Sequence, residues 1–418
     1  MTTTGLRDEV RAWLRENWST SVTLAEWWRR LFEAGYAHPA WPEGLGGRGM
    51  SRDDARAVTA ELAAAQVIGP PLGVGQGLGG GTLLAHGGPD LQARFLPPLA
   101  RGDEAWVQLF SEPGAGSDLA SLSTRAVLDG DEWVINGQKV WSSGAFTADR
   151  GMLLARTDPD VPQHKGITYF IIDMDQSGVE VRPLRQLSGE AHFCEVFLND
   201  ARVPADRVVG TVGDGWRVAR TTLALERDGL GGEGLAGLRI IECGRKSGNL
   251  DRVVADLLAE PVPAARTAFF LSPQAMVALA RERGLTTDPV IRNALADYRI
   301  EAEVMRLTGQ RVKAAAAQGR PPGPEASTLK LAMSLQGRRF RDLLLKILGP
   351  DGVLVDADGP DDGRAHAAFY WSFAGTIGGG TDEIQRNVIA ERVLGLPRDP
   401  DPSRDVPYRD LKTGTRAP

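Results

Sequence analysis

The most informative segment of the sequence is Thr376-Ile377-Gly378-Gly379-Gly380-Thr381-Asp382-Glu383-Ile384-Gln385-Arg386. It predicts a glycine turn that leads into a helix, with Thr381 as the capping residue and two carboxylates in the first turn, where a helix favours negative charge. Three glycines let the backbone approach a ligand closely, and the free N–H groups at the start of the helix point outward. We therefore expect a planar or anionic ligand at this turn.

Two earlier segments fit the same interpretation. One is a strand end followed by a glycine-rich loop, Gln108-Leu-Phe-Ser-Glu-Pro-Gly-Ala-Gly-Ser-Asp118, and the other is Asn136-Gly-Gln-Lys-Val-Trp-Ser-Ser-Gly144. Together with the turn near the end of the chain, they resemble the acyl-CoA dehydrogenase family of flavoproteins in order and in spacing. The resemblance extends from about Leu6 to Pro397, and the combination of motifs is far more specific than any single glycine motif.

The expected fold is α+β, with helices at both ends of a β domain. Apolar residues repeat at helical spacing in the N-terminal domain, 1–105, and again in the C-terminal domain, 211–397. The long helix candidates of the C-terminal domain are Trp216 to Glu242, Pro289 to Gln318, Ser327 to Leu348 and Asp382 to Leu394. The middle domain, 106–210, contains short alternating runs joined by turn dipeptides such as Asp129-Gly130 and Asn136-Gly137, which predict an antiparallel sheet, a small barrel. Helical bundle, antiparallel β-barrel and helical bundle is also the family's architecture, and 398–418 is expected to be a polar, loosely docked tail.

Composition and charge exclude several function classes. The chain has 418 residues, 42% of them hydrophobic, and a net charge of -6, which disfavours a nucleic-acid binder. Two cysteines and five scattered histidines give neither a disulfide framework nor a metal-ligand pattern. The sequence has no secretory signal and no apolar run long enough for a membrane span, so we expect a cytoplasmic protein.

One glycine motif is set aside. The run Gly75-Gln-Gly-Leu-Gly-Gly80 satisfies a dinucleotide-binding pattern, but it follows Pro70-Pro71 instead of a parallel strand. Since no strand–helix–strand unit surrounds it, we interpret it as a glycine-rich connection between helices.

The resemblance implies a set of FAD-binding residues in the two earlier segments. Gln108, Phe110 and Ser111 correspond to residues that line the isoalloxazine ring, and Gly116 and Ser117 to residues beside the pyrophosphate, with Ser117 also near the substrate. Trp141 corresponds to an indole that shields the reactive face, although a buried strand tryptophan is the simpler structural interpretation. Ser143 corresponds to a hydroxyl near N5, and lies two residues from Trp141 on the same expected strand face.

The resemblance also implies contacts near the end of the chain. Thr381 and Glu383 correspond to residues at the adenine half of FAD, and Gly349 to a glycine that a neighbouring subunit offers. This chain departs from the family at Lys346 and Pro350, where glutamine and glycine are more usual. It also has Arg245-Lys-Ser-Gly248 and an apparent insertion, 249–284, in place of the family's Arg-x-x-Phe-Gly motif, which puts the contact between an arginine and a partner's flavin pyrophosphate in doubt.

The expected catalytic base is a carboxylate, because removal of a proton next to a thioester carbonyl needs a base in a water-poor pocket. Much of the family has this glutamate directly before Gly-Thr, where this chain has Gly379. Other branches, including isovaleryl-CoA dehydrogenase, have it in a Leu-x-x-Glu-Arg setting on the helix after the β domain. Leu223-Ala-Leu-Glu-Arg227 matches that setting, so Glu226 is the candidate base and Arg227 a neighbour that shapes the substrate pocket, although a solvated glutamate paired with an arginine is the structural alternative.

The resemblance therefore implies an FAD-dependent oxidoreductase that acts on the CH–CH group of an acyl-CoA, forms a trans-2-enoyl-CoA and passes electrons to an electron-transfer flavoprotein. Gly379 leaves space that suits a branched or bulky acyl group, such as a steroid side chain, and keeps its backbone N–H for the substrate carbonyl. We expect a homodimer or homotetramer. The alternatives are a non-catalytic subunit of a heterotetramer, or a relative that oxidises an acyl-carrier-protein-bound or other substrate.

Overall fold

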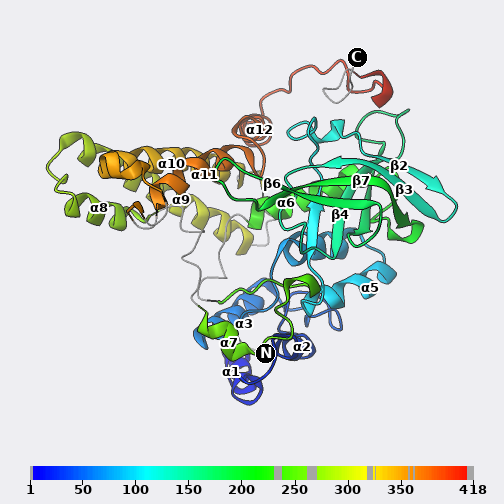
Figure 1. Cartoon of the computed structure of the whole chain (residues 1–418), viewed down its shortest axis with the longest axis horizontal. Coiled ribbons are helices and arrows are strands. Elements are labelled where there is room, and N and C mark those ends of the chain that lie inside the picture. Colours follow the sequence, from blue (N-terminus) through cyan, green and yellow to red (C-terminus); the bar gives the residue numbers. More distant parts are fainter. Residues whose placement is uncertain are drawn as a thin grey trace. The chain divides into compact units, whose positions relative to one another are not determined.

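The computed structural model describes residues 3–229, 238–260, 271–317, 323–324, 326–355, 358–360 and 363–411. The chain forms two compact units (Figure 1). Unit 1 comprises Met1–Gln186, Ala191–Val262 and Asp401–Pro418, and unit 2 comprises Leu187–Glu190 and Pro263–Pro400. Each unit is described by itself.

The N-terminal helices of unit 1 confirm the helical pattern of the sequence. They are α1 (Thr3–Asn17), α2 (Leu24–Glu33), α3 (Arg52–Ala64), α4 (Gly81–His86) and α5 (Pro89–Ala100). Thr23 caps α2 by accepting a hydrogen bond from the Glu26 N–H at 3.2 Å. Trp27 and Trp28 are fully buried against α1 and α3, and their indole N–H groups donate to the carbonyls of Ile68 and Gly69.

The middle of unit 1 is a curled, seven-stranded sheet. Its strands are β1 (Trp106–Leu109), β2 (Arg125–Asp129), β3 (Glu132–Lys139), β4 (Arg150–Arg156), β5 (Ile167–Asp173), β6 (Val179–Leu184) and β7 (Phe193–Pro204). The order is β1-β4-β2-β3-β7-β6, with β5 paired to β4. Four pairs are antiparallel, whereas β4 runs parallel to β1 and, at one residue pair, parallel to β2, so the C-terminal ends of β1 and β4 lie at one edge of the sheet.

Of the two expected turns, one is confirmed and the other is wrong. Asp129 pairs with Glu132 across Gly130, which confirms a two-residue hairpin. The turn expected at Asn136-Gly137 is wrong, because β3 continues through it with a bulge in its pairing to β7. Gly137 is required there by close packing, since a Cβ would lie 2.4 Å from the Thr124 hydroxyl oxygen.

The glycine run of the N-terminal region is helical. Gly75–Gly80 forms a π-helix, η1, that continues directly into α4, which agrees with a connection between helices and not with a dinucleotide-binding loop. π-Helical turns are frequent at functional sites.

After the sheet, unit 1 continues with α6 (Gly215–Gly229), the short turn η4 (Arg245–Ser247) and α7 (Val254–Ala259). We expected one helix from Trp216 to Glu242; residues 230–237 lie outside the described part, and 238–242 are not helical. Arg239 instead forms a β-bridge with Ile68.

Unit 2 is helical. It contains α8 (Pro273–Glu282), α9 (Pro289–Ala317), α10 (Ala326–Leu348), α11 (Arg364–Ile377) and α12 (Asp382–Val388), with the π-helix η7 (Ile389–Val393) after α12. The expected boundaries of α9 and α10 agree closely with these, and the helix expected from Asp382 to Leu394 is α12 continued by η7. Helix α8 lies in the apparent insertion and was not expected. Across the described residues, no helix combines the length and the apolar character that crossing a membrane requires.

Candidate active site

The expected base and an expected flavin-lining residue lie side by side in unit 1. The amide Nε2 of Gln108, on β1, is 3.5 Å from the carboxylate Oε2 of Glu226, on α6, although 118 residues separate them in the sequence. Both side chains are partly buried, and Gln108 is the one residue of β1 that is not fully buried. The Glu226 carboxylate therefore reaches a side chain of β1, and its role as the base stays a prediction.

Close packing between α4 and α6 positions Glu226. A Cβ at Gly81 would lie 2.7 Å from Leu225 Cδ1, so glycine allows this part of α4 to approach α6 next to the base. The hydroxyls of Thr82 and Thr222 are 2.8 Å apart, and Thr222 lies one turn before Glu226. Both threonines are buried, so this hydrogen bond fixes the register of the two helices.

A buried ion pair holds the two flavin-binding segments together. Lys139, the last residue of β3, donates to Glu112 Oε1 at 2.8 Å and to the Phe110 carbonyl at 3.0 Å. Glu112 also accepts from the N–H groups of Ser123 and Thr124 and from the Ser123 hydroxyl. Burial opposes ionisation of Glu112, but the charge of Lys139 and these hydrogen bonds outweigh it and lower the pKa of Glu112 to about 2.

Sequence reasoning missed this pair. A lysine in the alternating strand Glu132–Lys139 is typical of a solvent-facing position, whereas the Lys139 side chain is 0% exposed. The signal that was available is the glutamate of Ser-Glu-Pro, which needs a partner if its loop is buried.

The remaining residues of the first segment differ in exposure. Phe110 is buried and packs edge-on against Tyr169, with ring centroids 5.7 Å apart, so only its backbone is placed to contact a ligand. Ser111 is partly buried, and its carbonyl accepts from the Val140 N–H at 2.9 Å, which ties this segment directly to the second one. Gly116 and Ser117 are exposed in the loop that follows.

Trp141 and Ser143 lie beyond the end of β3, so the expectation of a shared strand face is wrong. Trp141 has a φ of 63°, and this left-handed backbone ends the strand. Its indole is 57% exposed, which rules out the buried-aromatic alternative, and Ser143 is also exposed.

The arrangement around Trp141 fits a flavin. The exposed indole offers an aromatic face, and the Ser142 hydroxyl is buried without a hydrogen-bond partner among the described residues. A ligand with polar ring edges would satisfy such a group. The residues of unit 1 that would hold FAD are Gln108, Phe110, Ser111, Gly116, Ser117, Trp141 and Ser143.

Unit 2 presents the glycine turn as the sequence predicted it. Thr381 caps α12 by accepting from the Ile384 N–H at 3.2 Å, and Gly379 has a φ of 66°. Glu383 and Gly349 are exposed, and Gln385 Nε2 donates to the carbonyl of Gly379 at 2.9 Å. Gln385 Oε1 is buried without a hydrogen-bond partner within the described ranges, so this turn also retains an acceptor that a ligand donor would satisfy.

Two expectations concern residues that lie wholly or partly outside the described part of the chain. Arg227 belongs to α6, but its side chain lies outside the described residues, as do 261–270 of the apparent insertion 249–284.

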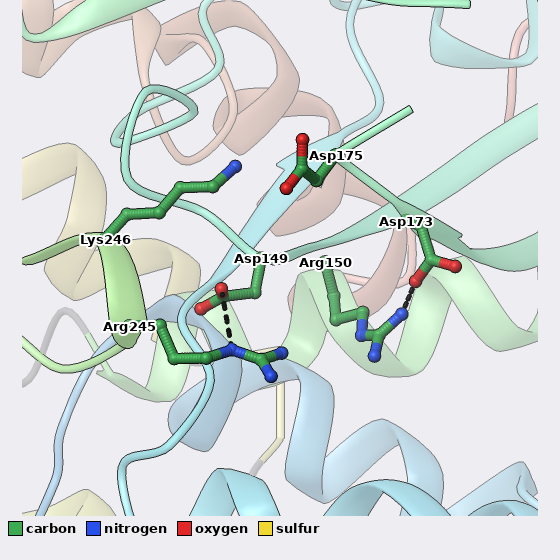
Figure 2. Close-up of a pocket in the computed structure, with 6 residues that line it drawn as sticks. All are labelled: Asp149, Arg150, Asp173, Asp175, Arg245 and Lys246. Carbon is green, nitrogen blue, oxygen red and sulfur yellow. Dashed lines mark hydrogen bonds and ion pairs between the residues drawn. The ribbon is translucent and has the colours of Figure 1, made fainter. Parts of the chain in front are cut away.

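A pocket of about 410 Å³ in unit 1 contains none of the expected site residues. Figure 2 shows its lining, which consists of Asp149, Arg150, Asp173, Asp175, Arg245 and Lys246. Arg245 Nε is 3.4 Å from Asp149 Oδ1, and Arg150 is paired with Asp173. Arg245 is thus engaged by carboxylates of its own unit, and we interpret this mixed-charge pocket as part of the packing of η4 against the sheet.

Known protein families and structures match nearly the whole chain. The N-terminal, middle and C-terminal domain models of acyl-CoA dehydrogenase match residues 2–103, 108–201 and 271–394. Acyl-CoA dehydrogenase IpdE1 of Mycobacterium tuberculosis is 38% identical over 94% of this chain and 97% of that protein. FadE34 of the same organism is 39% identical over 94% of this chain, which spans about half (49%) of FadE34.

Solved structures agree with these relatives. The Tcur3481-Tcur3483 steroid ACAD has a TM-score of 0.69 and 28% identity, covering 95% of this chain and 98% of that one. The ChsE4-ChsE5 complex from Mycobacterium tuberculosis has a TM-score of 0.66 and 27% identity, with 95% and 98% coverage. Because all three domain models match and a relative is 38% identical over 94% of the chain, the chain belongs to the acyl-CoA dehydrogenase family, whose members are FAD-dependent oxidoreductases.

Proposed function

We propose that this protein is an FAD-dependent acyl-CoA dehydrogenase that desaturates the α,β bond of an acyl-CoA thioester, with Glu226 as the base. The observation that carries the proposal is the 3.5 Å contact between Gln108 and Glu226. It joins a residue of the expected flavin-lining segment to the expected base, and no feature of the local sequence requires the two to meet.

Four residues of the chain have separate roles in the proposed reaction. Glu226 takes the α-proton of the substrate, and Gln108 holds the carboxylate by donating an amide hydrogen to it. The backbone N–H of Gly379 donates to the thioester carbonyl, and Ser117 contacts the substrate beside the flavin. Bound FAD supplies the acceptor for the hydride that leaves the β-carbon.

The acyl group is proposed to be branched or bulky. Gly379 carries no side chain in the turn, and the solved neighbours include a steroid ACAD. We propose an electron-transfer flavoprotein as the electron acceptor and a cytoplasmic location.

We propose that the protein is a homodimer or homotetramer. On α9, Ile300, Val304 and Leu307 are 60%, 56% and 46% exposed, at a spacing that places them on one helix face. Such an apolar stripe on a long helix favours burial against another chain. Light scattering of the chain expressed alone should give a dimer or tetramer, and a monomer that recruits a related chain on co-expression would favour a heteromer instead.

The experiment that tests the function is flavin reduction by a panel of acyl-CoA thioesters under anaerobic conditions. Purified protein should carry FAD, and Glu226→Gln should retain FAD and ligand binding while reducing the flavin at least roughly 10²–10⁴-fold more slowly. Glu16→Gln, an exposed substitution on α1, is the matched control and should behave as the parent. Colourless protein that takes up no FAD, or a Glu226→Gln variant as fast as the parent, would refute the assignment.

A further inference from the structure

Residues beyond the last matched family domain form an ordered contact with the sheet of unit 1. The C-terminal domain match ends at residue 394, and the sequence predicted a loosely docked tail for 398–418. Asp401–Leu411, however, packs onto unit 1, and its short turn η8 (Tyr408–Asp410) buries Tyr408 to 4% exposure. The segment is therefore held by a specific anchor.

The backbone of this segment is held by the loop between β4 and β5. The Tyr408 N–H donates to the Val161 carbonyl and the Arg409 N–H to the Pro159 carbonyl, both at 2.9 Å. Pro407 forms a β-bridge with Pro162. These contacts place the Tyr408 ring at a fixed position on the surface of the sheet.

The Tyr408 ring covers a buried arginine. The Arg156 guanidinium lies 3.4 Å from the centre of the ring, and Arg156 itself is 3% exposed. A buried cation needs compensating groups, and an aromatic face is one of them. Arg156 donates to the carbonyls of Ala120 and Leu122 at 2.6 and 3.2 Å.

The Tyr408 hydroxyl completes the set by donating to the carbonyl of Ser121 at 3.3 Å. Three consecutive carbonyls, those of residues 120, 121 and 122, are thus held by Arg156 and Tyr408. They belong to the turn η2 (Leu119–Ser121) and the residue after it, directly following the loop of Gly116 and Ser117.

We propose that Asp401–Leu411 is a clasp that fixes this loop, with Tyr408 as a positioning residue for Ser117. The part that concerns ligand binding rests on the proposed function. In the clasped state the loop keeps one conformation, so the ligand does not have to order it on binding.

Hydrogen exchange and kinetics of full-length variants test the clasp. Tyr408→Ala removes the ring and the hydroxyl, and amide exchange over 119–122 should accelerate roughly ten- to a hundredfold. Tyr408→Phe removes only the hydroxyl and should accelerate amide exchange over the same residues about fivefold. Asp405→Ala, an exposed change in the same segment, is the control and should leave exchange unchanged.

The kinetic arm separates positioning from general stability. With Tyr408→Ala, KM for the acyl-CoA should rise about tenfold while kcat changes less than twofold. The reason is that binding must then include the free-energy cost of ordering the loop, whereas the chemical step is unchanged. A synthetic peptide of residues 401–411 should lower that KM, and the same peptide with alanine for Tyr408 should not. Unchanged exchange in Tyr408→Ala overturns the clasp, and faster exchange with an unchanged KM overturns the positioning role. If the parent protein binds no FAD and turns over no thioester, the proposed function fails, whereas the exchange arm still decides the clasp.

Discussion

Replacing Lys139 by methionine is the sharpest test of how the site is held together. The substitution leaves Glu112 buried, with its three donors from Ser123 and Thr124 but without a counter-charge. Breaking one side of a buried ion pair costs roughly 3–5 kcal/mol. The pKa shift of Glu112 gives a similar free energy. On folding, its pKa falls from 4.5 to about 2, which corresponds to about 3 kcal/mol of stability at pH 7.

The sign of the pH dependence follows from that shift. In the parent, Glu112 contributes stability above pH 4.5, and this contribution is lost as the pH falls from 4.5 towards 2, the pKa of the folded state. Without Lys139 the carboxylate loses its counter-charge and keeps only its hydrogen bonds, so this part of the acid sensitivity should become smaller. Denaturant unfolding followed by tryptophan fluorescence at pH 7 and pH 3.5 measures both effects.

A double-mutant cycle separates the pair from its individual members. Lys139→Met and Glu112→Gln should each cost about 3 kcal/mol, and the double variant should cost clearly less than the sum, because no charge is left buried. Both single variants should also weaken FAD binding, since Lys139 holds the Phe110 carbonyl in the expected flavin segment. Lys165→Met, an exposed lysine in the loop between β4 and β5, is the control. Single variants that cost under about 1 kcal/mol, or strictly additive costs, would refute the reasoning.

Three further predictions follow from local geometry. Gln108→Leu should slow flavin reduction about fivefold with FAD retained, because one weak hydrogen bond to the base is lost; an unchanged rate would remove Gln108 from its proposed role. Gly80→Ala should lower the free energy of unfolding by about 1–3 kcal/mol, since its Cβ would lie 2.2 Å from a tryptophan ring carbon, whereas Gly77→Ala meets no atom within 4 Å and should be tolerated; equal melting temperatures would contradict this. Burial lowers the pKa of His38 to about 4, so the stability it contributes is full above pH 6.5 and falls by about 2 kcal/mol at pH 5, a dependence that His38→Gln should remove in pH-resolved unfolding.

The sequence predicted those parts of the fold that local patterns specify. Periodicity located α9 and α10 to within a residue or two, and the Asp129-Gly130 dipeptide located a hairpin, because both signals act over a few residues. The same rule failed at Asn136-Gly137. There Gly137 is required by Thr124, a neighbour in space that no local pattern reveals.

The candidate site shows the same difference between features that local patterns predict and features that depend on neighbours in space. Motifs predicted the site residues, and the structure brings two of them, Gln108 and Glu226, together. They did not predict the buried contacts of Lys139 with Glu112 or of Arg156 and Tyr408 with the carbonyls of residues 120–122. Lys139, Arg156 and Tyr408 are charged or amphipathic side chains whose burial depends on partners tens of residues away, so their sequence context resembles that of ordinary surface positions.

The position of the carboxylate is consistent with the backbone that carries it. Gly379 has a φ of 66°, a left-handed conformation that costs a residue with a Cβ about 1–2 kcal/mol. A glutamate at position 379 would therefore be strained unless the turn changed its conformation. The hydrogen bond from Gln385 to the Gly379 carbonyl opposes such a change. Glu226 lies in the regular helix α6, where a long side chain has no such backbone cost and where the Gly81 contact brings the helix to the end of β1. Helix α6 is thus compatible with the proposed base at Glu226, whereas a glutamate at position 379 would carry a backbone cost.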